Sequence, residues 1–474
     1  MQLEVRKPKA QTLLLILAIL VVGSVGLQAL AQVHVPAADA SLRLDAASRA
    51  AVAGKYAQVL AGHYVFADKG SEMAAAIRAK LTAGSFDGIS SPIEFAKTLT
   101  ADVRAVVNDR HLRVEYNPSP VYSGGPVHIR VRRRRSGHSG HREMPPGMIA
   151  QTKRDNGGIL EVKVLPGNIG YMFIRWMAPQ TQPTKAAIAA AFAFLHHTNA
   201  LIIDLRGNPG GMGYAELFMS YLSEGPRFVT AIAHWREGKS TREQIFKTQD
   251  MGAASYGNKK PVFVLTSRLT FSAAEGLAYE IQAFKRGLIV GETTGGGAHP
   301  SNQGFGAVPL GYGFSAFVPT GDVINPVTRT NWEGVGVKPN VRVPAGEALG
   351  KAWSLAAERL KAATTNPQRR LLFDALSLAK LEGSPTLTPA QLAGRYSMKG
   401  GGPVFTIIER GGNLYYQVSN PFRAEVPLVP SGGNRYNLNG VPGHSMTFFM
   451  KNGKIEMLPL LPNIFLHTPV LEKQ

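Results

Sequence analysis

The sequence of 474 residues contains no cysteine, so disulfide bonds, thiolate metal sites and a cysteine nucleophile are all excluded. Long apolar runs are also scarce, because only one is present and it lies close to the N-terminus. A bundle of membrane-spanning helices is therefore excluded. The remaining composition is that of an ordinary globular protein, and the length is sufficient for two or three domains.

The N-terminus has the pattern of a secretory signal peptide, in which basic residues precede an apolar run over residues 13–27. Ala29-Leu30-Ala31 follows and has the small-x-small form of a cleavage site. We expect residues 1–31 to be removed, so that the mature chain begins at or near Gln32. The alternative is an uncleaved membrane anchor, although the run is short for a full span of about 20 residues. Either interpretation predicts export, to the periplasm or the cell exterior.

Acidic residues are in deficit, and the formal net charge is +20. Part of this excess is concentrated in residues 128–142, which include the basic run from Arg130 to Arg135. Such a cluster suits contact with an anionic surface, or it is simply a solvated loop. No aromatic interleaving or recognition-helix pattern accompanies it, so we expect no nucleic-acid partner.

The chain divides by pattern into a helical N-terminal domain at 43–110, an α/β core at 111–350, a helical connector at 351–384 and a small all-β domain at 385–474. Strands and helices alternate in the core, which favours a sheet with crossover helices. Residues 122–158 are basic and rich in Gly and Pro, and are predicted to form a loop. The β-domain contains no chemistry-bearing cluster and is expected to be a structural or binding appendage.

A serine stands where an apolar, β-branched run becomes a helical pattern, in PVFVLTSRLTFSAAEGLAYEIQAFKR at residues 261–286. Ser272 and Glu275 form the S-x-x-E of a capping box, so a helix N-cap is the simpler interpretation. A strand-to-helix turn is also where some hydrolases place a serine nucleophile. In that case the N–H of Ala273, at the start of the helix, could donate to an oxyanion.

Three further segments contain groups that such a nucleophile needs. IIDLRGNPGGMG at 202–213 predicts a buried strand followed by an anion-binding Gly-rich loop, and it has neither a dinucleotide fingerprint nor the Gly-Lys-Ser/Thr of a P-loop. His111 in DRHLRV is a candidate base, and His299 in GETTGGGAHP is an alternative. Glu333 in TNWEGVGVKPNVRV could orient the base, although an ordinary loop carboxylate is the simpler interpretation.

Five segments in this order resemble the S41 peptidase family: NIGYMFI, ALIIDLRGNPGG, TSRLTFSAAEGLAY, IVGETTGGGAHP and NWEGVGVKPNVRV. The resemblance covers residues 43–350 and is strongest to bacterial members similar to interphotoreceptor retinoid-binding protein. Those members have a helical N-terminal domain and no PDZ insert. The resemblance implies a ClpP/crotonase-like α/β core and a serine peptidase of the tail-specific type.

The resemblance also assigns roles. The serine after the TS strand is the family's nucleophile, which is Ser272 here, and the oxyanion N–H of the Gly-rich loop falls on Gly210 or Gly211. The C-terminal processing members use a Ser–Lys dyad, but TTGGGAHP contains no lysine. Tricorn-type members use a His and a Glu instead, which match His111 and Glu333.

No cofactor and no metal are implied, and the expected partners are peptides or unfolded proteins. The rival hypothesis is a catalytically inactive S41-like module that binds an apolar ligand or a peptide. An unperturbed histidine base would give the pH profile an acid limb at about 6.5. The substrate, the position of the cleaved bond and the oligomeric state stay open.

Overall fold

The computed structural model describes residues 43–117, 146–213, 215–225, 227–238, 240–301, 308–379, 384–398, 404–417, 425–438, 445–460 and 470–474. The predicted signal peptide, with its cleavage site before Gln32, lies outside the described residues, as does the basic run from Arg130 to Arg135. Within the described ranges, no helix has both the length and the apolar character that crossing a bilayer requires.

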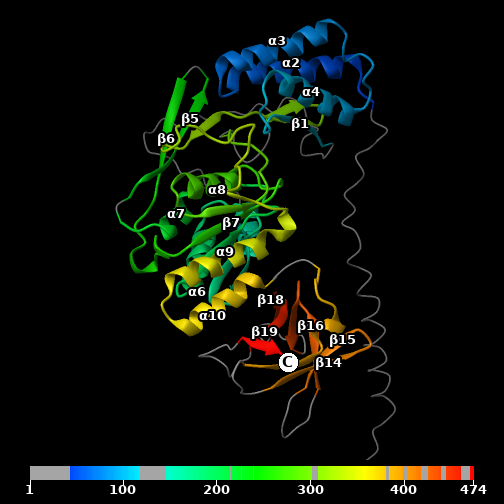
Figure 1. Cartoon of the computed structure of the whole chain (residues 1–474). Helices are drawn as coiled ribbons and strands as arrows, with labels where there is room; N and C mark the ends of the chain where they lie inside the picture. Colours follow the sequence, from blue (N-terminus) through cyan, green and yellow to red (C-terminus); the bar gives the residue numbers. More distant parts are fainter. Residues whose placement is uncertain are drawn as a thin grey trace, which may run out of the picture.

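Three helices form the N-terminal part of the molecule, at the top of Figure 1. They are α2 (Ala46–His63), α3 (Ala67–Thr82) and α4 (Pro92–Val106). Helix α4 begins with a regular N-cap, because Ser91 accepts the Glu94 N–H and Pro92 occupies the first helical position. Their apolar faces share one core with a small antiparallel sheet. That sheet has the order β1 (Arg113–Tyr116), β10 (Phe314–Phe317) and β9 (Val308–Gly311).

A six-stranded sheet forms the centre of the molecule, with the order β12-β8-β7-β4-β3-β2. All neighbours are parallel except β2 and β3, which run antiparallel. The strands are β2 (Ile159–Leu165), β3 (Ile169–Ile174), β4 (Ala200–Asp204), β7 (Val262–Thr266), β8 (Leu288–Gly291) and β12 (Val341–Arg342). Every residue of β4 and β7 is buried, because both faces of a parallel sheet are covered.

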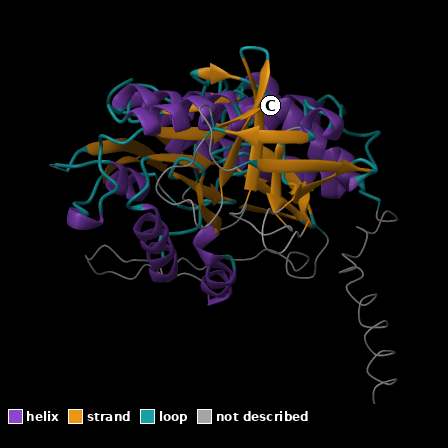
Figure 2. Cartoon of the chain, turned by 60° about the horizontal axis from the view of Figure 1, so that its bottom comes forward, coloured by secondary structure: helices purple, strands orange, loops and turns teal. Residues whose placement is uncertain are grey.

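Helices cover both faces of this sheet. Figure 2 shows the helices of the chain in purple and its strands in orange. Leu201 and Ile203 of β4 share one apolar cluster with α6 (Gln182–Leu195), α7 (Glu216–Leu222) and α8 (Ala273–Ala283). Ile202 points to the opposite face, which is covered by α9 (Ala348–Ala363) and α10 (Pro367–Leu378). This alternation is the period-2 pattern of a strand. The predicted α/β core, with helices at the N-terminus and an all-β domain at the C-terminus, is confirmed.

Some local predictions were wrong or incomplete. The predicted loop at 122–158 contains α5 (Pro146–Arg154) and the 3₁₀ turn η1 (Asn156–Gly158) within its described part. Helix α7 begins only at Glu216, because the glycines hold the preceding loop in positive φ. A further sheet was not anticipated, made of β11 (Gly321–Ile324), β5 (Val229–Glu237) and β6 (Ser240–Lys247). The polar, largely exposed residues of β6 conceal its strand pattern.

The C-terminal part is a closed antiparallel barrel of eight strands, drawn in orange and red at the bottom of Figure 1. A short helix, α11 (Pro389–Leu392), precedes it. The strands are β13 (Gly394–Ser397), β14 (Phe405–Arg410), β15 (Asn413–Gln417), β16 (Glu425–Pro430), β17 (Arg435–Leu438), β18 (Ser445–Lys451), β19 (Lys454–Leu460) and β20 (Leu471–Lys473). Asn452 and Gly453 both have positive φ between β18 and β19, as a type I′ turn requires.

Two strands of the barrel are apolar on both faces. Phe448 and Met457 point into the barrel, whereas Phe449 and Leu458 pack outward into the cluster that contains α9 and α10. The Lys451 ammonium adds a contact of 2.6 Å to Asp374 on α10. The barrel is therefore attached to the α/β core by a buried apolar contact.

Leu458→Ala tests this attachment. We expect the free energy of unfolding to fall by about 2–5 kcal/mol, because the change leaves a cavity at a fully buried position. Val429→Ala, at a position that is 44% exposed on the same barrel, should cost less than about 1 kcal/mol. Urea unfolding of both variants measures the difference, and equal stabilities would show that the barrel does not support the core.

Candidate active site

Ser272 lies on a sharp turn between β7 and α8, at the carboxyl end of the parallel strands. Its φ of 54° and ψ of −124° are unusual for a residue with a side chain. The Ser272 N–H donates to the Glu275 carboxylate at 2.8 Å, which is one half of the predicted capping box. A strained serine between a strand and a helix has the geometry of a nucleophile elbow.

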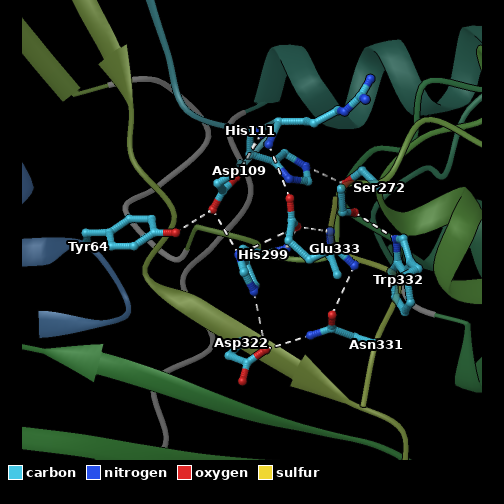
Figure 3. A network of polar contacts seen from close by, with 12 residues as sticks. Tyr64, Asp109, His111, Ser272, His299, Asp322, Asn331, Trp332 and Glu333 are labelled. Carbon is cyan, nitrogen blue, oxygen red and sulfur yellow. Dashed lines mark hydrogen bonds and ion pairs between the residues drawn. The ribbon is translucent and has the colours of Figure 1, made fainter. Parts of the chain in front are cut away.

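His111 is the partner of Ser272 in this structure. Its Nε2 lies 3.0 Å from Ser272 Oγ, although 161 residues separate the two in sequence (Figure 3). The imidazole lies between the rings of Phe271 and Phe317, with centroids 4.7 and 5.6 Å away. The Arg113 guanidinium lies over the Phe317 ring, 4.5 Å from its centroid. Aromatic packing thus fixes the plane of the imidazole.

The surroundings of His111 keep its ring neutral. Burial lowers the pKa of His111 to about 4, and the nearby charge of Asp109 only partly opposes this effect. Its Nδ1 is buried and has no hydrogen-bond partner among the described residues. A neutral imidazole can accept a proton through Nε2, so the ring is in the state that a general base requires.

The Gly-rich loop and the start of α8 each bring one backbone N–H group close to this pair. The Gly210 N–H donates to Asn208 Oδ1 at 2.9 Å, so Gly210 is occupied and does not fit its predicted oxyanion role. Among the described residues, the N–H groups of Gly211 and Ala273 have no acceptor. A Cβ on Gly210 would lie only 2.7 Å from the Cβ of Ser272, which shows how closely the loop approaches the turn.

Asn208 is a positioning residue that the sequence analysis missed. It is fully buried, its Nδ2 donates to Ile174 O at 2.8 Å, and its backbone carbonyl accepts the Phe271 N–H at 2.9 Å. These bonds join the end of β3, the Gly-rich loop and the residue before Ser272. The only sequence signal is an asparagine in a Gly-rich loop, which is also typical of an ordinary turn.

Glu275 has a similar function on the other side of Ser272. Besides the Ser272 N–H, its buried carboxylate accepts N–H bonds from Gly296 at 2.6 Å and Gly297 at 2.8 Å, and it contacts the Thr294 hydroxyl. Burial raises the pKa of Glu275, and these hydrogen bonds partly offset the effect. The capping residue therefore also fixes the loop that follows β8.

A cluster of four ionisable side chains lies behind His111 (Figure 3). His299 is at its centre, with Nδ1 2.9 Å from Asp109 Oδ2 and 3.6 Å from Glu333 Oε2, and with Nε2 3.5 Å from Asp322 Oδ1. Asp109 also accepts the Tyr64 hydroxyl at 3.0 Å and the His111 backbone N–H at 2.9 Å. Asp109 was not singled out from the sequence, where Asp-Arg-His is typical of solvated charges.

The two histidines differ in what their ring nitrogens face. Both ring nitrogens of His299 face carboxylates, whereas His111 faces Ser272, so the structure does not place His299 as the alternative base. Burial alone would lower the pKa of His299, but its hydrogen bonds to Asp109 and Asp322 and the surrounding negative charge raise that pKa to about 10. A histidine that stays protonated at neutral pH cannot accept a proton from serine.

Glu333 lies near His111 but is not hydrogen-bonded to it among the described contacts. Its carboxylate accepts the backbone N–H groups of Arg110 at 3.2 Å, Ala298 at 2.5 Å and His299 at 3.1 Å. Burial raises the pKa of Glu333, the charge of Asp109 raises it further, and His299 opposes both. The predicted direct orientation of the base by Glu333 is therefore not what the structure contains.

Two carboxylates of this cluster, together with His111, form the candidate for cation binding among the described residues. One ligand atom from each of Asp109, His111 and Glu333 lies within 4.8 Å of the others. The carboxylates already have hydrogen-bond donors in the backbone, in Tyr64 and in His299. Their arrangement is explained without an ion.

The close approach of Gly210 to Ser272 gives a sharp prediction. Gly210→Ala places a Cβ 2.7 Å from both Phe271 O and Ser272 Cβ, so the nucleophile turn must shift, and activity should fall about 100-fold or more. Gly207→Ala is the matched control, because Gly207 has a similar positive φ but open space around it. It should cost about 1 kcal/mol of stability and keep its activity. Peptide turnover and thermal melts of both variants provide the test, and a fully active Gly210→Ala would contradict this geometry.

Comparison with known proteins identifies the family of the chain. Residues 168–343 match the model of peptidase family S41, and residues 37–129 match the model of the N-terminal domain of peptidase S41 in eukaryotic IRBP. The two matches together cover more than half of the chain. The chain belongs to peptidase family S41, as the sequence motifs predicted.

Two similar solved structures are a lipoprotein from Streptococcus agalactiae and a photosystem II D1 C-terminal processing protease. The lipoprotein is 15% identical with a TM-score of 0.40, and the match covers 66% of this chain and 96% of that one. The processing protease is 16% identical with a TM-score of 0.37, and the match covers 63% of this chain and 94% of that one.

Proposed function

We propose that this protein is an exported serine peptidase of the S41 type, with Ser272 as the nucleophile and His111 as the general base. The observation that carries the proposal is the 3.0 Å separation between Ser272 Oγ and His111 Nε2 at a strained strand-to-helix turn. Family membership supports peptides or proteins as the substrates. Export rests on the N-terminal sequence alone.

The chemistry follows from the geometry. Ser272 Oγ attacks the carbonyl carbon of the peptide bond while His111 Nε2 takes the hydroxyl proton. The N–H groups of Gly211 and Ala273 donate to the oxyanion, and Ala273 adds the positive end of the α8 dipole. His111 then gives its proton to the leaving amine, which produces an acyl-enzyme. Water, activated by the same imidazole, hydrolyses the ester and restores Ser272.

Asp109 and Glu333 support His111 through charge rather than through a hydrogen bond to its ring. The imidazolium that forms during attack is stabilised by negative charge close by, and one atom of each carboxylate lies within 4.8 Å of a His111 ligand atom. Asp109 also accepts the His111 backbone N–H, and this hydrogen bond fixes the backbone from which the imidazole extends.

Labelling with a serine-directed fluorophosphonate tests the proposal. The folded, exported protein should be modified at Ser272, Ser272→Ala should stay unlabelled, and heat-denatured wild type should lose the reaction. N-terminal sequencing of the labelled protein should begin near Gln32. Failure of the folded wild type to react, together with tight binding of an apolar ligand, would favour an inactive binding module instead.

A further inference from the structure

His299 is a buried histidine that the proposed chemistry does not use, yet it has the densest set of charged neighbours in the described part of the chain. Its side chain is 8% exposed and that of Asp109 is not exposed at all. The charged groups that face it are Asp109 from the N-terminal part and Asp322 and Glu333 from the core. The Phe66 ring packs edge-on against the imidazole, with the ring centroids 5.4 Å apart. Three carboxylates therefore surround one imidazole.

We propose that His299 is a positioning residue, a fixed cation that docks the segment carrying His111 against the core and thereby sets the distance between His111 and Ser272. This inference rests on the proposed function for its catalytic consequence, although the charge state of His299 can be measured independently. Two contacts of the His299 ring define this role: Asp109 lies beside one ring nitrogen, and Asp322 lies beside the other.

The connection runs from the core to the base in two steps. His299 follows β8 and contacts Asp109, which follows α4, across the boundary between the central sheet and the N-terminal helices. Asp109 Oδ1 then accepts the backbone N–H of His111 at 2.9 Å. His111 Nε2 faces Ser272 at 3.0 Å. A change at His299 is therefore transmitted to the nucleophile through Asp109 and the backbone of His111.

Charge balance explains why a cation is needed at this position. Asp109 has no exposed surface and lies near Glu333, so two ionised carboxylates would repel each other in a buried site. Burial raises the pKa of Asp109, but the hydrogen bond and charge of His299 overcome this effect and lower it. The raised pKa of His299 agrees with its role as the compensating charge. A neutral residue at 299 would leave Asp109 either unpaired or protonated.

The first test measures charge directly and is independent of turnover. Nitrogen-15 NMR of the histidine-labelled full-length mature protein should give one imidazole with both ring nitrogens protonated at pH 8, and His299→Gln should remove that signal. An ordinary histidine is neutral at this pH, because its pKa is about 6.5. A neutral His299 signal at pH 8 would overturn the proposal, whether or not the protein is a peptidase.

The second test measures positioning. His299→Gln should lower kcat about 100-fold with little change in KM, because His111 is displaced while the substrate cleft is retained. Loss of a positive charge near His111 should also move the acid limb of the pH profile upward. His197→Gln, at an exposed position after α6, is the matched control and should change neither quantity. An unchanged acid limb and kcat in His299→Gln would refute the proposal.

A double-mutant cycle separates positioning from general damage. Asp109→Asn and His299→Gln should each lower the melting temperature, whereas the double variant should be more stable than the sum of the two losses predicts, because neither buried charge is left without its partner. If the two losses of stability were strictly additive, this result would contradict a direct pairing of Asp109 with His299. If wild type were inactive but the NMR and the cycle gave the expected results, the proposed function would fail while the docking role of His299 stood.

Discussion

Ser272→Ala is expected to reduce peptide turnover by roughly 10⁴- to 10⁶-fold and to leave the fold intact. The hydroxyl faces His111 at 3.0 Å, so its loss removes the attacking atom. If Ser272 acted only as a helix cap, the same change would cost about 1 kcal/mol of stability and leave turnover intact. The two outcomes are opposite, so one set of activity assays and thermal melts distinguishes them.

Ser272→Gly adds a stability readout to this experiment. The φ of 54° at Ser272 is strained for any residue with a Cβ, and glycine adopts it freely. We therefore expect Ser272→Gly to be about 1–3 kcal/mol more stable than Ser272→Ala, with both variants inactive. Equal stability of the two would show that the turn is not strained, and wild-type activity in either would refute Ser272 as the nucleophile.

His111→Ala should approach the loss of activity of Ser272→Ala, because residues that act as a unit are not additive. The combined variant should then be no worse than either single one. Turnover of an unstructured protein by the three variants provides the measurement. A His111→Ala enzyme with near wild-type activity would remove this histidine from the chemistry.

The pH profile makes the assignment of His111 more specific. Burial lowers the pKa of His111 to about 4, so the base is neutral above that pH and kcat/KM should fall only as the pH drops through it. The acid limb of the pH profile, expected at about pH 6.5 for an unperturbed histidine, is thereby moved to a lower pH. The lowered folded-state pKa also means that the contribution of His111 to stability is complete above about pH 6.5 and declines as the pH falls toward 4. An acid limb at 6.5 would show that the ring is solvated in the working enzyme.

The turn that carries Ser272 could be predicted from the sequence because its signals are local. A buried strand, Ser272 and a helical pattern are consecutive, and the Gly-rich loop at 207–211 has a recognisable composition. His111 has no such local signature, since any one of twelve histidines could be the base until the resemblance to a family selects it. The structure brings the two side chains together through packing that the sequence does not display.

The supporting residues could not be predicted, because their roles depend on contacts distant in sequence. Asp109 is buried only because Tyr64 and His299 reach it from separate segments. Glu333 was predicted to orient the base, but three backbone N–H groups compete for its carboxylate. Burial and competition of this kind are properties of the assembled fold.

The pairing of β1 with β10 has a consequence for the order of events during synthesis. Arg113 lies opposite Phe317, so the strand that follows His111 finds its partner about 200 residues later in the chain. Contacts of such long range form late, because a large loop must close first. A ribosome-bound chain that already contains both His111 and Ser272 therefore has no partner for β1 until β10 has emerged. Under the proposed function, a nascent chain that ends before β10 has no proteolytic capacity.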